Sequence, residues 1–185
     1  TTGQLTTWQP VNTRPVFQIT NSVLDPATFY TAAGGAGGNV QDFHIGDSTG
    51  APKWKVEVDG DGTGVAVTDT EVFLVGHFGH VAASAKDICP TPTSPSQPVS
   101  CNFGSQTVSN HLAAFDLNGK LLGNFTAQAN TPKGPQFAYL GAEDLYVGGD
   151  FTGVASAPNP SGGVAAYHKQ PGLAIFHTCP SSAAC

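Results

Sequence analysis

The fold is decided by the stretch Val72-Phe-Leu-Val-Gly-His-Phe-Gly-His-Val81, because it recurs as Leu145-Tyr-Val-Gly-Gly-Asp-Phe-Thr-Gly-Val154. Each copy runs from β-forming residues into glycine, then Phe, and ends on Val. Internal self-similarity is the sequence signature of repeat architectures, in which small units pack side by side. The repeat therefore predicts several similar β-sheets, and it says little about chemistry.

Three units align around this repeat, each with an opening strand, a second strand, a turn and a third strand. The opening strands are expected at 28–33, 72–75 and 145–147. The second strands are expected at 40–45, 111–116 and 164–168. The third strands are expected at 52–58, 120–125 and 173–177, and short fourth strands at 65–67 and 136–140 link the units.

Four short strands per unit, repeated with turn signals between them, are typical of the blades of a β-propeller. We expect an all-β chain with an N-terminal extension at 1–20 and blade repeats over 21–185. The repeats are about three four-stranded antiparallel units, at approximately 24–67, 68–140 and 141–178. Because a propeller needs four or more blades to close, three units predict an incomplete propeller or one completed by a partner. A two-sheet sandwich with accidental similarity is the alternative.

The composition favours a loop-rich extracellular protein. Only 11% of the 185 residues are charged, against about 25% in typical soluble proteins, whereas Gly (23) and Pro (14) are abundant. The net charge is -6 and the seven Lys and Arg are scattered, which argues against nucleic acid or an anionic membrane as a partner. No apolar run is long enough for a membrane-spanning helix, so no membrane insertion is expected. A chain that starts at Thr1 suggests a mature secreted or cell-surface product without its leader.

Four cysteines support an oxidising compartment. Cys89 and Cys101 bracket one Pro-rich loop, and Cys179 and Cys185 bracket another. Three pairings are open, and we favour the two local ones, Cys89–Cys101 and Cys179–Cys185. The first would close a loop within an insertion at 82–110, and loops of that length in compact domains are often functional.

Two stretches resemble a known family. Leu145-Tyr-Val-Gly-Gly-Asp-Phe-Thr-Gly-Val154 resembles the opening strand of delta-60 repeats, and Asn110-His-Leu-Ala-Ala-Phe-Asp116 followed by Asn118-Gly119 resembles the next strand and turn. The resemblance covers most of 72–167 and is weaker over 24–54. It implies β-propeller blades, usually within larger secreted or surface proteins. The family carries no agreed catalytic residues, so the resemblance implies none here.

One motif suggests a metal. Asp59-Gly-Asp-Gly-Thr-Gly64 places oxygen ligands at the first, third and fifth positions and glycine at the sixth, as at the start of a calcium loop. The motif predicts calcium on Asp59, Asp61 and Thr63. An ordinary Asp-Gly turn between two strands explains the same residues.

Other motifs have weaker implications. Gly46-Asp-Ser-Thr-Gly50 matches the nucleophile-elbow pattern, but no helix follows and a hairpin turn explains it. His77 and His80 lie three apart on an expected strand and so point to opposite faces, which argues against a shared metal. Asn124 begins an N-x-T glycosylation sequon. Trp54 is a candidate for stacking against a sugar, with core packing as the alternative.

These observations predict a secreted, non-catalytic β-propeller module for binding or self-assembly. Its partners would be further copies of the chain, another chain that completes the stack, or a glycan. The alternative is a carbohydrate-active or other hydrolase with a site at the propeller mouth, which would need paired carboxylates. The candidate carboxylates are Asp42, Asp47, Asp59, Asp61, Asp116, Glu143, Asp144 and Asp150.

Overall fold

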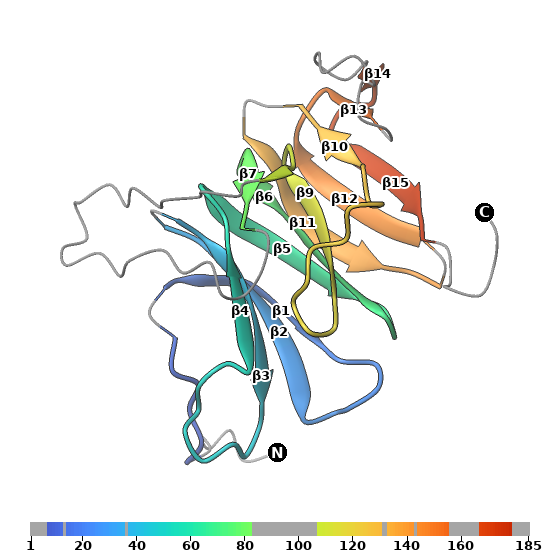
Figure 1. Cartoon of the computed structure of the whole chain (residues 1–185). Coiled ribbons are helices and arrows are strands. Elements are labelled where there is room, and N and C mark those ends of the chain that lie inside the picture. Colours follow the sequence, from blue (N-terminus) through green and yellow to red (C-terminus); the bar gives the residue numbers. More distant parts are fainter. Residues whose placement is uncertain are drawn as a thin grey trace.

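The computed structural model describes residues 7–12, 14–35, 37–82, 107–130, 133–142, 144–155 and 167–178. Within these ranges the chain is all-β, with antiparallel strands in small sheets and no helix (Figure 1). The all-β class predicted from the sequence is confirmed. The described ranges also contain no helix long and apolar enough to cross a membrane.

Three sheets carry most of the fold. The N-terminal sheet contains β1 (Val16–Asn21), β2 (Thr28–Ala33), β3 (Asn39–His44) and β4 (Trp54–Glu57). The central sheet contains β5 (Asp61–Val67), β6 (Glu71–His77) and β9 (Leu112–Asp116). The C-terminal sheet contains β11 (Gly134–Leu140), β12 (Asp144–Asp150) and β15 (Leu173–His177). All neighbouring strands are antiparallel. The N-terminal sheet is a meander of consecutive strands, whereas strands of the small sheets precede β9 and β15 in the chain.

Two small sheets complete the described part. One pairs β7 (His80–Val81) with β8 (Thr107–Val108), the two ends of the segment that holds the insertion. The other joins β10 (Gln128–Ala129), β13 (Gly153–Ala155) and β14 (His168–Lys169). Figure 1 shows this second small sheet beyond one end of the C-terminal sheet.

The same irregularity interrupts the first hairpin of each large sheet. The strand register shifts between Val16 and Gln18 in the first hairpin. It shifts in the same way between Gly62 and Gly64 and between Pro135 and Phe137. Such a β-bulge puts one extra residue on one strand and redirects its side chain. The three bulges identify the equivalent extra residues, which are Phe17, Thr63 and Gln136.

The bulge explains the glycine of the repeated stretch. Gly76 and Gly149 lie opposite the bulge on the second strand of their hairpins. A Cβ on Gly76 would lie 2.0 Å from the Asp61 carbonyl oxygen, and one on Gly149 would lie 2.6 Å from the Gly134 carbonyl oxygen. The repeated glycine therefore allows close approach of backbone within each hairpin.

The central sheet is the middle layer of the molecule. Val72 and Leu74 belong to the core between the central and N-terminal sheets, whereas Phe73 and Val75 belong to the core between the central and C-terminal sheets. Side chains alternate between the two faces of a strand, so a strand covered on both faces needs a continuous apolar run. This burial explains the uninterrupted Val-Phe-Leu-Val of the repeat.

One side chain ties the three sheets together. The Gln18 amide on β1 donates to the Val65 carbonyl oxygen on β5 at 2.9 Å and to the Ala138 carbonyl oxygen on β11 at 2.7 Å. Its own oxygen accepts from the Ala138 amide at 3.3 Å. Gly64 lets β5 and β11 approach at this point, because a Cβ there would lie 2.7 Å from the Ala138 nitrogen. The first strands of the sheets thus meet at one junction.

The structure corrects two strand assignments in the last units. The second strand of the third unit was expected at 164–168, but β15 takes that place, pairing with β12 as β9 pairs with β6. His168 lies in β14, which pairs with β13. The expected third strand at 120–125 is reduced to one bridge between Leu121 and Phe115. Local periodicity indicates where strands form, but pairing with distant residues decides their place in a sheet.

The sheets also begin earlier than the aligned units. Residues 65–67 and 136–140, expected to end one unit, lie in β5 and β11, the first strands of the following sheets. Similarly, β1 lies largely within the segment 1–20 that was expected to be an extension, and it is the first strand of the N-terminal sheet. The three large sheets therefore each open with the strand that carries the bulge.

Candidate functional site

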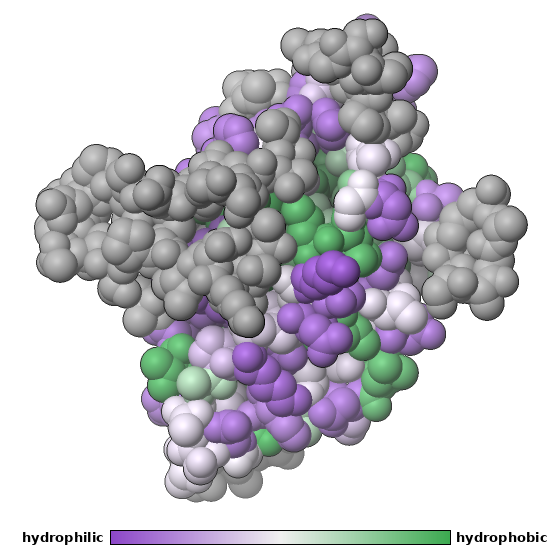
Figure 2. Space-filling view, viewed as in Figure 1, coloured by the Kyte–Doolittle hydropathy of each residue, from purple (hydrophilic) through white to green (hydrophobic). Residues whose placement is uncertain are grey.

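The outward face of the C-terminal sheet is apolar and open. Its exposed fractions are 51% for Phe137, 66% for Tyr139, 47% for Leu173 and 56% for Ile175. Tyr146 is half-buried between them, since Tyr139, Tyr146 and Ile175 are neighbours across the three strands. Contiguous exposed apolar patches of this kind mark interaction surfaces. Figure 2 shows hydrophobic side chains on the surface in the region where Figure 1 draws the central and C-terminal sheets.

In the other two sheets, the equivalent face is buried. The bulges align Tyr146 on β12 with Phe73 on β6 and with Tyr30 on β2. Tyr30 is 2% exposed and Phe73 is 1% exposed. Tyr30 packs in the core against the central sheet, and Phe73 packs in the core against the C-terminal sheet. Each sheet therefore turns the same face toward the following sheet, and in the C-terminal sheet that face is open.

The opposite end of the stack is different. On the outer face of the N-terminal sheet, Phe29, Thr31, Gln41 and Phe43 are all buried. The Trp8 ring packs edge-on against Phe29, and the Thr31 hydroxyl donates to the Gln41 side-chain oxygen at 3.3 Å. The middle of this face is covered and partly polar, and Ile19 on the edge strand β1 is exposed there. The C-terminal sheet, in contrast, exposes apolar side chains on all three of its strands.

A second feature lies where the bulges of the three sheets meet. A hollow of about 340 Å³ is lined there by Phe17, Asp61, Thr63, His77, Lys133 and Gln136. All three bulged residues belong to this lining, together with a carboxylate, an ammonium group and an imidazole. None of the three sheets could form this hollow alone.

Local contacts fix the walls of the hollow. The Phe17 ring lies against Gly34, where a Cβ would come within 2.1 Å of the ring. The Asp61 carboxylate accepts the Gly35 backbone N–H at 2.6 Å. The Thr63 hydroxyl bonds to the Pro135 carbonyl oxygen at 2.9 Å, which joins β5 to β11. These contacts hold one aromatic and one acidic side chain at the rim and a hydroxyl between the strands.

A histidine pair stands beside the hollow. The His77 ring stacks on His111, with ring centroids 6.0 Å apart and planes inclined by 8°. His111 is buried, has a φ of 72°, and its Nδ1 lies 3.1 Å from the Gly76 carbonyl oxygen. Burial lowers the pKa of His111, so its imidazole is neutral at neutral pH and Nδ1–H donates to that carbonyl. The exposed His77 ring therefore rests on a fixed neutral ring.

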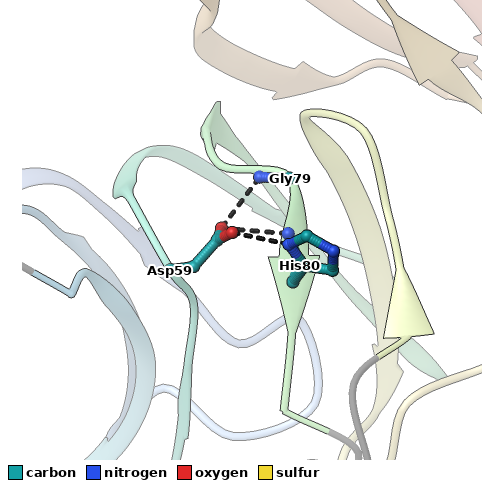
Figure 3. A network of polar contacts seen from close by, with 3 residues as sticks. All are labelled: Asp59, Gly79 and His80. Carbon is teal, nitrogen blue, oxygen red and sulfur yellow. Dashed lines mark hydrogen bonds and ion pairs between the residues drawn. The ribbon is translucent and has the colours of Figure 1, made fainter. Parts of the chain in front are cut away.

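Asp59 forms a backbone clamp, shown in Figure 3. Its Oδ1 accepts the Gly79 N–H at 2.8 Å and the His80 N–H at 2.9 Å, and its Oδ2 lies 2.7 Å from His80 Nδ1. Burial raises the pKa of Asp59, but the hydrogen bonds from His80 and Gly79 outweigh it and hold the pKa below its usual value. The clamp fastens the turn after β6 to the start of β5.

The same clamp recurs with a neutral side chain. Asn130 Oδ1 accepts the Thr152 N–H at 2.9 Å and the Gly153 N–H at 2.9 Å. Thr152 and Gly153 occupy the places in the second copy of the repeat that Gly79 and His80 occupy in the first. Asp59 therefore has a structural role that Asn130 also has in the second copy of the repeat. The sequence did not reveal it, because the two clamp residues differ in type and in distance from the repeat.

This clamp bears on the calcium motif. Asp59 binds the turn at Gly79, whereas Asp61 accepts from Gly35 at the hollow, so the two carboxylates are engaged by separate partners. The hydroxyl of the third residue, Thr63, donates to backbone carbonyl oxygens. Among the described residues no group of three His, Cys, Asp or Glu side chains could hold a metal ion. Calcium at this motif stays a prediction from sequence.

The structure places the remaining sequence candidates in different settings. Trp54 is 9% exposed, packs between Tyr30 and Phe115, and donates from Nε1 to the Leu117 carbonyl oxygen at 2.9 Å. Its ring thus packs in the core, which was the alternative to stacking on a sugar, and sugar stacking at Trp54 stays a prediction from sequence. Asn124 is exposed at a turn, in a position open to glycosylation. The four cysteines and most of the insertion lie outside the described residues.

Several of the carboxylates considered for hydrolysis make local structural contacts. Asp47 and Asp116 accept backbone N–H groups in their own turns. Asp144 pairs with His177 at 2.9 Å across the C-terminal sheet. Asp42 is 4% exposed, and burial raises its pKa. Glu143 lies outside the described residues, and no hydrogen bond or ion pair of the described residues joins two of the other carboxylates.

Comparison with models of protein families, with curated proteins and with solved structures finds no match for this chain. The resemblance to delta-60 repeats therefore rests on the two sequence stretches that carry it. What the protein does has to be argued from its own two surfaces, the open sheet face and the hollow at the bulges.

Proposed function

We propose that this chain is a secreted, non-catalytic module of β-propeller-like repeat units that functions in assembly. A second copy of the chain binds the open face of the C-terminal sheet. One observation supports this proposal above all others: the face carrying Tyr146 is open, although its equivalents on the other two sheets are buried. The low charge, the repeat and the resemblance to delta-60 repeats support the extracellular, propeller-like part of the proposal.

The energetic argument follows from exposed apolar surface. Burying a large apolar side chain is worth about 1.5–3 kcal/mol relative to leaving it in water. The five apolar side chains carry no charge. The Asp144–His177 pair lies at one end of the same face, so a partner has to leave this pair at the hydrated edge of the contact. The face is Phe137, Tyr139, Tyr146, Leu173 and Ile175. A second apolar sheet face would cover these side chains best.

The geometry of the two ends favours face-to-face pairing. A head-to-tail contact would need the outer face of the N-terminal sheet, but Phe29 and Phe43 there are already buried. Two C-terminal sheets packed against each other use the same surface twice. Such an isologous contact closes at a dimer, whereas a head-to-tail contact could continue into a filament.

Sedimentation analysis tests the proposal. We expect the chain to sediment at twice its mass of 18.9 kDa at about 10–100 µM, where a micromolar contact is well populated. Ile175→Glu places a charge within the face, next to Tyr146, and is expected to give the monomer. Lys169→Glu puts the same acid on the exposed strand β14, outside the face, and should leave the dimer intact. A folded wild-type chain that stays monomeric over this range refutes the proposal.

A further inference from the structure

Three β-bulges, one from each large sheet, direct their side chains into one hollow. We propose that this hollow, lined by Phe17, Asp61, Thr63, His77, Lys133 and Gln136, is a binding site for a neutral carbohydrate ring. The proposal does not depend on the assembly proposed above, because the open face is formed by other side chains.

The first argument is that the backbone repeats at the bulges while the side chains do not. The bulged residue is Phe17 in one sheet, Thr63 in the next and Gln136 in the third. Thr63 has a structural task, since its hydroxyl bonds to the Val75 and Pro135 carbonyl oxygens. Phe17 is 55% exposed, and no hydrogen bond to a described residue holds the exposed Gln136 amide. Two of the three bulges therefore present side chains that the fold itself does not use.

The second argument is the chemistry of the rim. Phe17 offers an aromatic surface for the C–H face of a sugar ring, and its orientation is fixed by the ring's contact with Gly34. Asp61 accepts hydrogen bonds, Lys133 donates them, and Gln136 does both. Ring hydroxyl groups also donate and accept, so they complement such a mixed rim.

The third argument is charge. The lining contains one carboxylate, Asp61, and one ammonium group, Lys133, and these two are not among the ion pairs of the described residues. The opposite charges cancel, so the rim selects neither a cation nor an anion. A single carboxylate also favours binding over hydrolysis, because glycosidases work with a pair. A volume of about 340 Å³ lies at the small end of ligand pockets, which suits one or two sugar rings.

Nuclear magnetic resonance titration of the ¹⁵N-labelled full chain tests the site. The probes are glucose, galactose, mannose and N-acetylglucosamine, with glycine and alanine as small zwitterions for comparison. We expect at least one sugar to shift the backbone amide signals of Gly35, Asp61 and Thr63 in a saturable way. Signals on β15, in the open face, should not move.

Three variants test the named contacts. Phe17→Ala removes the aromatic surface, and Gly34→Ala displaces the ring while keeping it; each should weaken sugar binding by about tenfold. Lys133→Gln alters an exposed side chain outside the core and should weaken binding severalfold with unchanged thermal stability, which excludes misfolding as the cause. Tyr139→Ala, on the open face, should bind as the wild type does.

Three outcomes would overturn the inference. They are saturable binding of glycine or alanine without binding of any sugar, sugar binding that Phe17→Ala and Lys133→Gln leave unchanged, and the absence of saturable shifts with every probe. Sedimentation of the same samples reports on assembly separately, so failure of the carbohydrate site and failure of the proposed dimer give different results.

Discussion

The central and C-terminal sheets share one hairpin, with the same bulge and the same glycine opposite it, yet only the central sheet is covered on both faces. Phe73 in the central sheet is 1% exposed, and its equivalent Tyr146 is half-buried beside Tyr139, which is 66% exposed. The side chains are similar, so the difference comes from position in the stack. A repeat unit determines its own hairpin, but its neighbours determine whether its faces are core or surface.

The clamps formed by Asp59 and Asn130 also compare two equivalent positions of the repeat. Asp59 and Asn130 each accept two consecutive backbone N–H groups after the second strand of their hairpin. The carboxylate also pairs with His80, whereas the amide donates to the Thr152 hydroxyl. Equivalent backbone geometry thus tolerates a charged or a neutral acceptor, and only the charged one responds to pH.

The largest expected effect is a difference in unfolding free energy between variants on the buried face of the central sheet and on the open face of the C-terminal sheet. Phe73→Ala should destabilise the folded monomer by about 3–5 kcal/mol, because it opens a cavity between the central and C-terminal sheets. Tyr146→Ala, at the equivalent position on the open face, should cost about 1 kcal/mol or less. Urea unfolding at a concentration where the chain is monomeric measures both. Equal losses for the two variants would contradict the assignment of the face as open.

A smaller effect is expected at the junction of the first strands. Gln18→Ala removes three hydrogen bonds and leaves two strand carbonyl oxygens and one N–H without their partner. We expect a loss of about 1–3 kcal/mol in unfolding free energy. Hydrogen exchange should show faster exchange in β11 than in β6, since β6 keeps its neighbours in the central sheet. Uniform acceleration would mean that Gln18 does not join the sheets specifically.

The smallest effect concerns pH. The pKa of Asp59 is lowered on folding, so its contribution to stability is complete above the usual carboxyl pKa of 3.8 and is lost as pH falls through the lower folded value. Asp59→Asn keeps an acceptor for the two N–H groups and should cost about 1 kcal/mol at neutral pH. It should also flatten the fall in melting temperature below about pH 4. Asn130→Asp, the reverse exchange at the neutral clamp, should steepen that fall.

Much of the fold was readable in the sequence. The strands at 28–33, 40–45 and 52–58 are close to β2, β3 and β4, because neighbouring strands joined by short turns pair locally. The third unit was less predictable. Its segment 156–166 lies outside the described residues, and the strand paired with β12 is β15, well beyond that segment.

The candidate sites were less readable than the strands. Trp54 resembles a stacking residue in the sequence, but Tyr30 and Phe115 occupy its surroundings in the core. The hollow at the bulges had no sequence signal, since Phe17, Thr63 and Gln136 share neither type nor motif. Only the common register of three hairpins shows that they are equivalent.

By itself, the sequence determined the repeat, the all-β class and the uninterrupted apolar run that makes β6 apolar on both faces. These properties follow from backbone preference and from side-chain periodicity along one strand, which are local. The tertiary structure decided which strand pairs with which, that Asp59 clamps the turn at Gly79, and that Tyr146 stays open where Phe73 is buried. Those outcomes depend on contacts between residues far apart in the chain, and no local pattern specifies them.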